Sequence, residues 1–88
     1  MATVEMYKRK SGFCPYCDRA ERLLRENGCD SINYIYVDED PSKLEEMVNR
    51  SSMRSMPQVF INGQHIGGAD ALSELAASGE LDRLLSLD

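Results

Sequence analysis

The sequence lacks any long apolar segment, any internal repeat and any linker or low-complexity stretch. None of its apolar runs approaches the roughly 18 residues that a membrane-spanning helix requires. The first residues, Met1 to Glu5, are too few and too polar to act as a secretory signal peptide. With 88 residues in all, the chain is expected to form a single domain over residues 1–88, with no membrane attachment.

Cysteine and histidine are scarce, with three cysteines and one histidine in the chain. A small, odd number of cysteines does not suit the disulfide framework of a secreted domain, so a reducing cytoplasm is the expected location. A structural zinc site needs four Cys or His ligands, usually as two close pairs. Beyond Cys14 and Cys17, only Cys29 and His65 remain, far apart in the sequence. We therefore expect no metal site, and a redox-active rather than structural role for the close pair.

Positive charge is in short supply, because 10 basic residues face 15 acidic ones and the formal net charge is −5. The resulting pI near 4.8 argues against general nucleic-acid binding. The basic residues are concentrated in residues 1–25, which also contain two of the three cysteines. Singly, such charges are ordinary solvated side chains, but as a group around a thiol they would attract an anionic partner.

Hydrophobic periodicity divides the chain into strands and helices. Segments rich in β-forming residues are expected to be strands: residues 3–7, 31–37, 58–61 and 64–66. Segments with helical spacing are expected to be helices: about 15–27, a second one opening at Asp40-Pro41, and a last region from Ala69 that is broken at Ser78-Gly79. The Asn62-Gly63 pair between the last two strands is a strong hairpin signal.

The order of these elements, β-α-β-α-β-β-α(α), predicts an α/β protein with a four-stranded mixed sheet flanked by helices. The first half is a βαβ unit, which implies parallel strands and a right-handed crossover. The second half adds an antiparallel hairpin and a closing helix. The helix that follows the first strand begins at the carboxyl edge of the sheet, where α/β proteins usually hold their sites.

The main chemical signal is Cys14-Pro15-Tyr16-Cys17, which opens this helix. If the helix begins at Pro15, Cys14 is its N-cap, and its sulfur faces unpaired N–H groups and the positive end of the helix dipole. This environment favours the thiolate, which is the nucleophilic form. Cys17 lies nearly one turn further on, on the apolar stripe, so it should be the more buried cysteine. We predict that Cys14 attacks a disulfide and that Cys17 resolves the mixed disulfide.

Three motifs together resemble those of dithiol glutaredoxins, which are thioredoxin-fold enzymes. They are Cys14-Pro15-Tyr16-Cys17, Ser55-Met56-Pro57 and Gly67-Gly68-Ala69-Asp70, in the family's order and with close to its spacing. The resemblance covers nearly the whole chain and is especially close to bacterial members. It implies a thioredoxin-like fold in which Pro57 is cis and faces the cysteines. It also implies a monomeric, glutathione-dependent thiol–disulfide oxidoreductase that reduces protein disulfides and glutathionyl mixed disulfides, with no permanently bound cofactor.

The resemblance also implies a glutathione site on this chain. Its expected contacts are Tyr16, Lys10, Met56, Pro57, Gly68, Ala69 and Asp70. The backbone of Met56 would pair with the extended peptide, the helix from Ala69 would present N–H groups to a carboxylate, and Asp70 would hold the α-ammonium group. Asp70 has a second interpretation as a favourable acid in the first turn of a helix.

The cation that binds the glycine carboxylate of glutathione stays open at this point. The loop before Cys14 is longer than in many family members, so Lys8, Arg9 and Lys10 are all candidates, and Arg54 is a candidate for a second contact.

Two other functions also stay open. One is an iron–sulfur carrier in which Cys14 and glutathione from two protomers hold a [2Fe–2S] cluster, although Pro15 and the second cysteine disfavour it. The other is a glutathione-independent donor with thioredoxin-like partners, against which the basic loop argues. Outside the motifs, Cys29 and His65 are expected to have structural roles.

Overall fold

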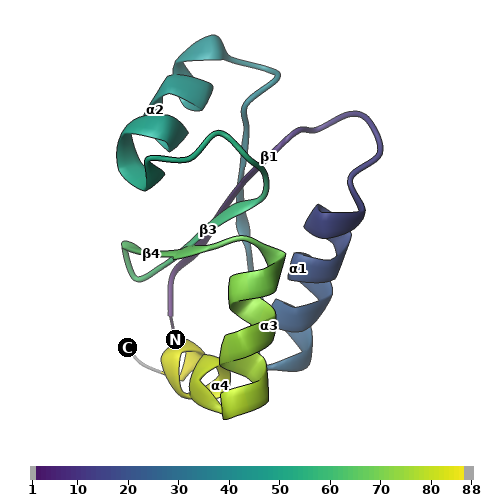
Figure 1. Cartoon of the computed structure of the whole chain (residues 1–88), viewed down its shortest axis with the longest axis vertical. Coiled ribbons are helices and arrows are strands. Elements are labelled where there is room, and N and C mark those ends of the chain that lie inside the picture. Colours follow the sequence, from purple (N-terminus) through teal and green to yellow (C-terminus); the bar gives the residue numbers. More distant parts are fainter. Residues whose placement is uncertain (1, 87–88) are drawn as a thin grey trace.

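The computed structural model describes residues 2–86 and contains a four-stranded sheet with helices on both faces (Figure 1). The strands are β1 (Val4–Lys8), β2 (Asn33–Tyr36), β3 (Gln58–Ile61) and β4 (Gln64–Gly67). The helices are α1 (Pro15–Glu26), α2 (Pro41–Ser51), α3 (Ala69–Ser78) and α4 (Glu80–Leu85). The predicted order of elements is confirmed. The ends of the predicted domain, Met1 and residues 87–88, lie outside the described range.

The sheet has the strand order β2-β1-β3-β4, so β1 lies inside it and β2 forms one edge. β1 is parallel to β2 and antiparallel to β3, which confirms the predicted mixed sheet. The strand expected over residues 31–37 is shorter in the structure. Its ladder runs from Asn33 opposite Glu5 to Tyr36 opposite Lys8, the last residue of β1, and the N–H of Val37 still donates to the Lys8 carbonyl.

The turns and helix starts follow from local chemistry. Asn62 and Gly63 both have positive φ, as a two-residue hairpin of this kind requires, and they join β3 to β4. Asp40 caps α2 through a hydrogen bond of 3.0 Å from the N–H of Ser42 to its carboxylate. Gly79, also with positive φ, separates α3 from α4 at the predicted break.

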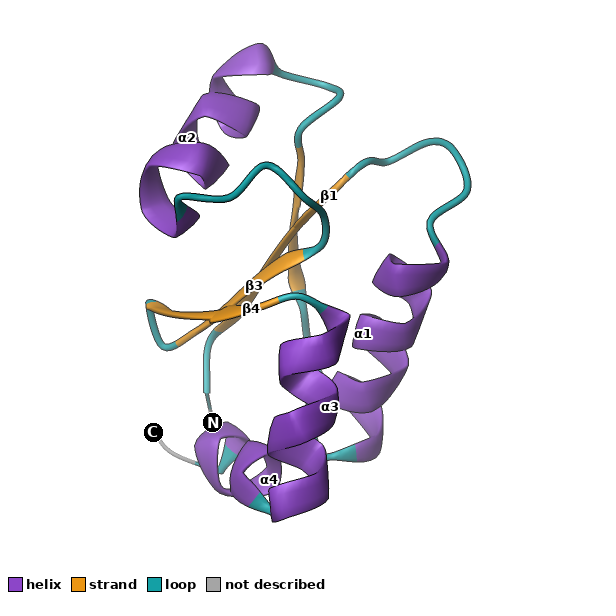
Figure 2. Cartoon of the chain, viewed as in Figure 1, coloured by secondary structure: helices purple, strands orange, loops and turns teal. Residues whose placement is uncertain are grey.

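Helices α1, α3 and α4 cover one face of the sheet, and α2 covers the other (Figure 2). The larger core contains Leu24 of α1 and Leu72 of α3, both fully buried. Helices α1 and α3 lie side by side with their first turns at the same end of the sheet (Figure 1). This shared packing therefore brings two helix N-termini together. Within residues 2–86, no helix has the length and apolar character needed to cross a bilayer.

The smaller core and a polar network fasten α2 to the opposite face. Tyr7 of β1 is buried against Phe60 of β3, and its hydroxyl donates to Glu46 and accepts a 2.7 Å hydrogen bond from Arg50. Arg50 also forms two 3.2 Å hydrogen bonds to the Glu5 carboxylate and lies over the Phe60 ring, 3.8 Å from its centroid. The Glu5 carboxylate is the main reason why the pKa of Arg50 is raised, so this guanidinium stays charged where it is partly buried.

Candidate active site

The two cysteines of the motif lie at the first turn of α1, as predicted. Cys14 is the N-cap, Pro15 is the first helical residue, and the Cys14 sulfur accepts a 3.2 Å hydrogen bond from the N–H of Cys17. The two cysteines form a disulfide, with their Cα atoms 5.3 Å apart. Cys17 is completely buried, whereas Cys14 is partly exposed. Cys14 is therefore the sulfur that an outside molecule can reach.

The loop between β1 and Cys14 is anchored by Asp38, which lies in the turn after β2. The Asp38 carboxylate accepts a 2.8 Å hydrogen bond from the N–H of Lys10, and two further bonds from the N–H and hydroxyl of Ser11. These bonds, that from the Lys10 N–H first, hold the pKa of Asp38 below its usual value. The sequence interpretation missed this residue, because it lies 28 positions from its partner in what reads as a solvated acidic turn.

A cleft of about 430 Å³ lies beside the first turn of α1. Its lining comes from three separate parts of the chain: Tyr16 in α1, the segment before β3, and the junction of β4 with α3. Six of the seven predicted glutathione contacts line it: Tyr16, Met56, Pro57, Gly68, Ala69 and Asp70. Residues of three motifs that are far apart in the sequence therefore line one cleft in the structure.

The wall of this cleft is formed by closely approaching backbone. The Met56–Pro57 peptide bond is cis, as the resemblance implied. A Cβ atom on Gly68 would lie only 3.1 Å from the carbonyl oxygen of Pro57, so a side chain at this position has little room. Within residues 2–86, the backbone of Met56 takes part in no hydrogen bond, which leaves its N–H and C=O to a ligand.

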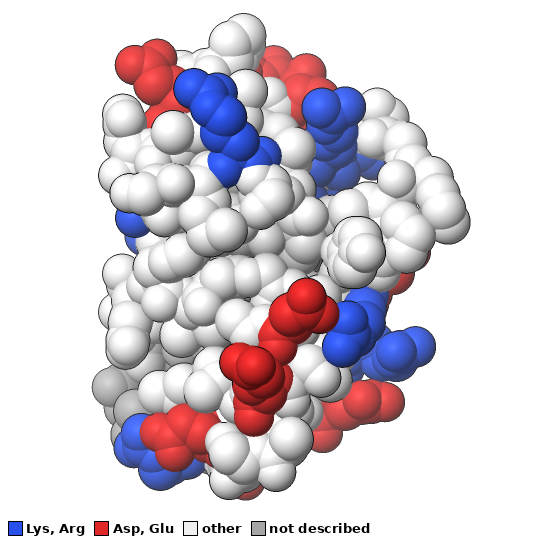
Figure 3. Space-filling view, in the orientation of Figure 1, with Lys and Arg blue, Asp and Glu red and all other residues white. Residues whose placement is uncertain are grey.

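The first turn of α3 provides a second wall. Its cap residue, Gly68, offers no side-chain acceptor, so the leading N–H groups of α3 are open to a carboxylate. Asp70 is 89% exposed and forms an ion pair with Arg19 of α1, with 3.1 Å between Oδ1 and Nη1. Basic side chains over α1 and acidic side chains over α3 also lie close together on the surface (Figure 3). A ligand ammonium at Asp70 therefore has to compete with, or share, a guanidinium.

The basic loop residues have different surroundings. The Lys10 ammonium lies 3.2 Å from the Glu39 carboxylate and over the Tyr36 ring, so Lys10 does not line the cleft. Lys8 lies over the ring of Tyr34. The remaining candidates, Arg9 and Arg54, line a neighbouring hollow of about 350 Å³ that also includes Met56. Two arginines therefore share a hollow with the residue whose backbone is unpaired.

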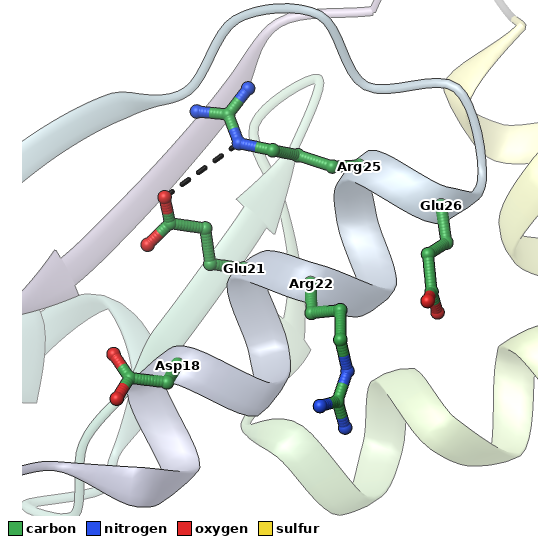
Figure 4. Close-up of a pocket in the computed structure, with 5 residues that line it drawn as sticks. All are labelled: Asp18, Glu21, Arg22, Arg25 and Glu26. Atoms are coloured by element: carbon green, nitrogen blue, oxygen red, sulfur yellow. Dashed lines mark ion pairs between the residues drawn. The ribbon is translucent and has the colours of Figure 1, made fainter.

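Another hollow, of about 570 Å³, runs along α1 and is lined by charged residues of this one helix (Figure 4). Glu21 and Arg25 lie on one side of the helix, with 3.6 Å between Arg25 Nε and Glu21 Oε1, and Arg22 points to another. All of its lining residues belong to one helix, whereas the cleft near Cys14 joins three parts of the chain and includes six of the predicted contacts, so the cleft is the candidate site. Within residues 2–86, no cluster of three or more His, Cys, Asp or Glu side chains is placed to hold a metal ion.

Comparison with known proteins decides the family. Residues 4–66 match the family model for glutaredoxin. The chain belongs to the glutaredoxin family. It is 47% identical over 85 residues to Glutaredoxin 3 of Escherichia coli (strain K12), which covers 97% of this chain and 99% of the relative.

Solved glutaredoxin structures have the same fold. The solution structure of glutaredoxin from Brucella melitensis is 41% identical, with a TM-score of 0.78 over 94% of this chain and 87% of that one. The crystal structure of a buckwheat glutaredoxin–glutathione complex is 26% identical, with a TM-score of 0.82 over 97% of this chain and 77% of that one. The predicted thioredoxin-like fold is confirmed. As a glutaredoxin, the protein is a thiol–disulfide oxidoreductase, and glutaredoxins use glutathione as a substrate.

Proposed function

We propose that this glutaredoxin is glutathione-dependent and reduces both protein disulfides and glutathionyl mixed disulfides, with Cys14 as nucleophile and Cys17 as resolving thiol. The observation that carries the proposal is the disulfide between a partly exposed Cys14 and a buried Cys17, beside a cleft that can hold an extended peptide. The buckwheat relative in complex with glutathione supports the choice of ligand.

For a glutathionyl mixed disulfide, the Cys14 thiolate attacks the sulfur of the glutathionyl group. A disulfide forms between Cys14 and glutathione, the old S–S bond breaks, and the protein thiolate leaves. A second glutathione thiolate then attacks the glutathione sulfur of this intermediate. Oxidised glutathione is released and the Cys14 thiolate is restored. The N–H of Cys17, which already donates to the Cys14 sulfur, stabilises the thiolate at both steps.

For a protein disulfide, both cysteines take part. The Cys14 thiolate attacks one sulfur and the other leaves as a thiolate, giving a mixed disulfide between Cys14 and the substrate. Cys17 then attacks the Cys14 sulfur, forms the disulfide of the present structure and releases the second substrate thiol. Two glutathione molecules reduce this disulfide and leave as oxidised glutathione.

The cleft and the hollow next to it together offer a partner for each charged end of glutathione. The peptide backbone pairs with Met56 while Tyr16 lies along it, the leading N–H groups of α3 face the α-carboxylate, and Asp70 takes the α-ammonium. For the glycine carboxylate we propose Arg9 together with Arg54, because both line a hollow that also includes Met56. Lys10 remains a prediction that would require its ammonium to leave Glu39.

Protein substrates are supported by apolar exposure around the reactive sulfur. Phe13, immediately before Cys14, is 91% exposed, and Tyr16 is 62% exposed. Large apolar side chains that flank a reactive group at the surface are typical of sites that contact other proteins. One chain supplies the whole cleft, which supports action as a monomer. The scarcity of cysteine and the redox chemistry support the cytoplasm as the location.

The test is the glutathione-dependent reduction of a small glutathionyl mixed disulfide, coupled to glutathione reductase. We expect Cys14→Ser to be inactive and Cys17→Ser to retain activity, because this substrate needs no resolving thiol. With a protein disulfide as substrate, both variants should fail. Cys29→Ser is the matched control, since it removes a buried thiol outside the cleft and should behave like the wild type with both substrates.

Absence of turnover by the wild-type protein with glutathione contradicts the proposal. Turnover of protein disulfides with a thioredoxin-reductase-type flavoenzyme in its place would identify a thioredoxin-like donor. A brown protein after anaerobic purification would identify the cluster carrier.

A further inference from the structure

A buried amide adjoins the cleft at the start of β3. Gln58 follows Pro57 directly, is only 1% exposed and lines the cleft together with Ser55 and His65. A side-chain amide has two N–H donors and one carbonyl acceptor, and burial without partners costs free energy at each. The surroundings of Gln58 therefore have to supply both kinds of partner.

Ser55 accepts from the amide nitrogen of Gln58, and His65 donates to its amide oxygen. The Gln58 nitrogen lies 2.9 Å from the carbonyl oxygen of Ser55 and 3.2 Å from its hydroxyl. The Gln58 oxygen lies 2.7 Å from Nε2 of His65 on the neighbouring strand β4. Because a backbone carbonyl can only accept, the amide nitrogen has to face Ser55 and the amide oxygen has to face His65. Nε2 of His65 therefore carries a hydrogen and donates it.

This chain of hydrogen bonds spans the segment on which glutathione is proposed to bind. Ser55 and Gln58 lie on either side of the Met56–Pro57 peptide bond, so the amide closes a short turn around it. Within residues 2–86, the bonds from Gln58 are the hydrogen bonds that reach residues 54–57. The position of the Met56 backbone therefore depends on how the Gln58 amide is held.

The position of the amide in turn depends on His65. Its ring packs at a tilt against the ring of Phe60, with 5.1 Å between the centroids, and this contact orients Nε2 toward β3. We propose that His65 is a positioning residue for glutathione: through Gln58 and Ser55 it sets the place of the Met56 backbone in the cleft. The proposal rests on the proposed function for its substrate, but the geometric effect on Met56 can be measured without turnover.

The test compares three substitutions on β4. His65→Leu removes the donor and leaves the Gln58 oxygen unpaired. His65→Gln supplies an amide N–H in its place. Gln64→Leu, at the exposed neighbouring position, is the matched control for a polar-to-apolar change on the same strand. The readouts are KM and kcat for the glutathionyl substrate, the alkylation rate of Cys14, and the NMR chemical shift of the Met56 backbone amide in the ligand-free protein.

We expect His65→Leu to raise KM about fivefold to tenfold, which corresponds to the loss of about one hydrogen bond in positioning. Its kcat and the alkylation rate of Cys14 should stay at wild-type values, and the chemical shift of the Met56 amide should change. His65→Gln should restore KM to within about twofold, and Gln64→Leu should leave it unchanged. A lower melting temperature with unchanged KM would mean that His65 only stabilises the fold, and would overturn the proposal. So would equal KM values for His65→Leu and His65→Gln.

Two further measurements cover the cases in which His65→Leu does not fold or the enzyme assay shows no turnover. If His65→Leu does not fold, Gln58→Met replaces it, since a side chain of similar length removes the whole chain of bonds; unchanged KM again overturns the proposal. If the wild-type protein shows no glutathione turnover, the proposed function fails by itself. The chemical shift of the Met56 amide then decides the positioning role: a change in His65→Leu that His65→Gln reverses supports it, and an unchanged shift refutes it.

Discussion

Substitution of Gly68 by alanine tests the closeness of the cleft walls. Gly68 has φ −102° and ψ −157°, an extended conformation that alanine also adopts, so the substitution introduces no backbone strain. The added Cβ atom would lie 3.1 Å from the carbonyl oxygen of Pro57. Ordinary contacts begin near 3.4 Å, so the segment before β3 has to move away by a few tenths of an ångström.

This displacement affects stability and binding differently. Slight overpacking costs about 1 kcal/mol of unfolding free energy, at the low end for added methyl groups in packed sites. The larger effect falls on the ligand, because Pro57 follows the residue whose backbone is proposed to pair with glutathione. We expect KM for the glutathionyl substrate to rise about threefold to tenfold, since misplacement of binding groups by fractions of an ångström reduces productive binding.

Gly63→Ala is the matched control. Gly63 has φ +78° at the tip of the β3–β4 hairpin, and nothing lies within 4 Å of an added Cβ atom. Alanine there costs about 1 kcal/mol through left-handed backbone strain, which is a loss of stability similar to that expected for Gly68→Ala. Urea unfolding and steady-state kinetics on both variants separate the two effects. An unchanged KM in Gly68→Ala, or an equal rise in Gly63→Ala, would refute the reasoning.

Three other predictions concern groups around the site. The pKa of Asp38 is lowered, above all by the hydrogen bond from the Lys10 N–H, so the ionised Asp38 carboxylate stabilises the fold above about pH 4, and this stabilisation is lost as the pH falls through the lowered pKa. Asp38→Asn should remove this part of the acid sensitivity in urea unfolding, and an unaltered pH profile would argue against the anchor. Burial raises the pKa of the Cys29 thiol, so in the reduced protein at pH 7 iodoacetamide should label Cys29 far more slowly than Cys14, as peptide mass spectrometry can check; equal labelling would contradict this. Tyr7→Phe removes the hydroxyl that bridges to the Glu46 carboxylate and should lower the unfolding free energy by about 1–2 kcal/mol in urea titrations, whereas unchanged stability would show that the network contributes little.

Several features of the site depend on local sequence alone, and these were predicted correctly. Cys14 as N-cap, Pro15 as first helical residue and the burial of Cys17 follow from the geometry of one helical turn and its apolar stripe. The Asn62-Gly63 turn likewise needs only the φ angles that these two residues tolerate. The order of elements then restricts the topology, because a βαβ unit has a single common handedness.

Side chains that meet across the sheet were not predictable in this way. Lys10 was expected at the glutathione site, but its ammonium lies against Glu39, whereas Arg9 lines the hollow that includes Met56. Long basic side chains in a loop have many rotamers, and the acidic residues that select among them come from another part of the chain. The bond from the Lys10 N–H to Asp38 was not predictable for the same reason.

The sequence by itself determined the N-cap position of Cys14, the burial of Cys17 and the order of the elements, because each depends on a short stretch of chain. The tertiary structure decided which carboxylate pairs with which cation, as in Arg19 with Asp70. It also brought His65 of β4 into hydrogen-bond contact with Gln58 of β3. Such pairs depend on strand register and helix packing, in which free energy from the whole core fixes positions that no short segment specifies. The position of the Cys14 sulfur at the start of α1 is therefore a local property, and the cleft near it is a property of the fold.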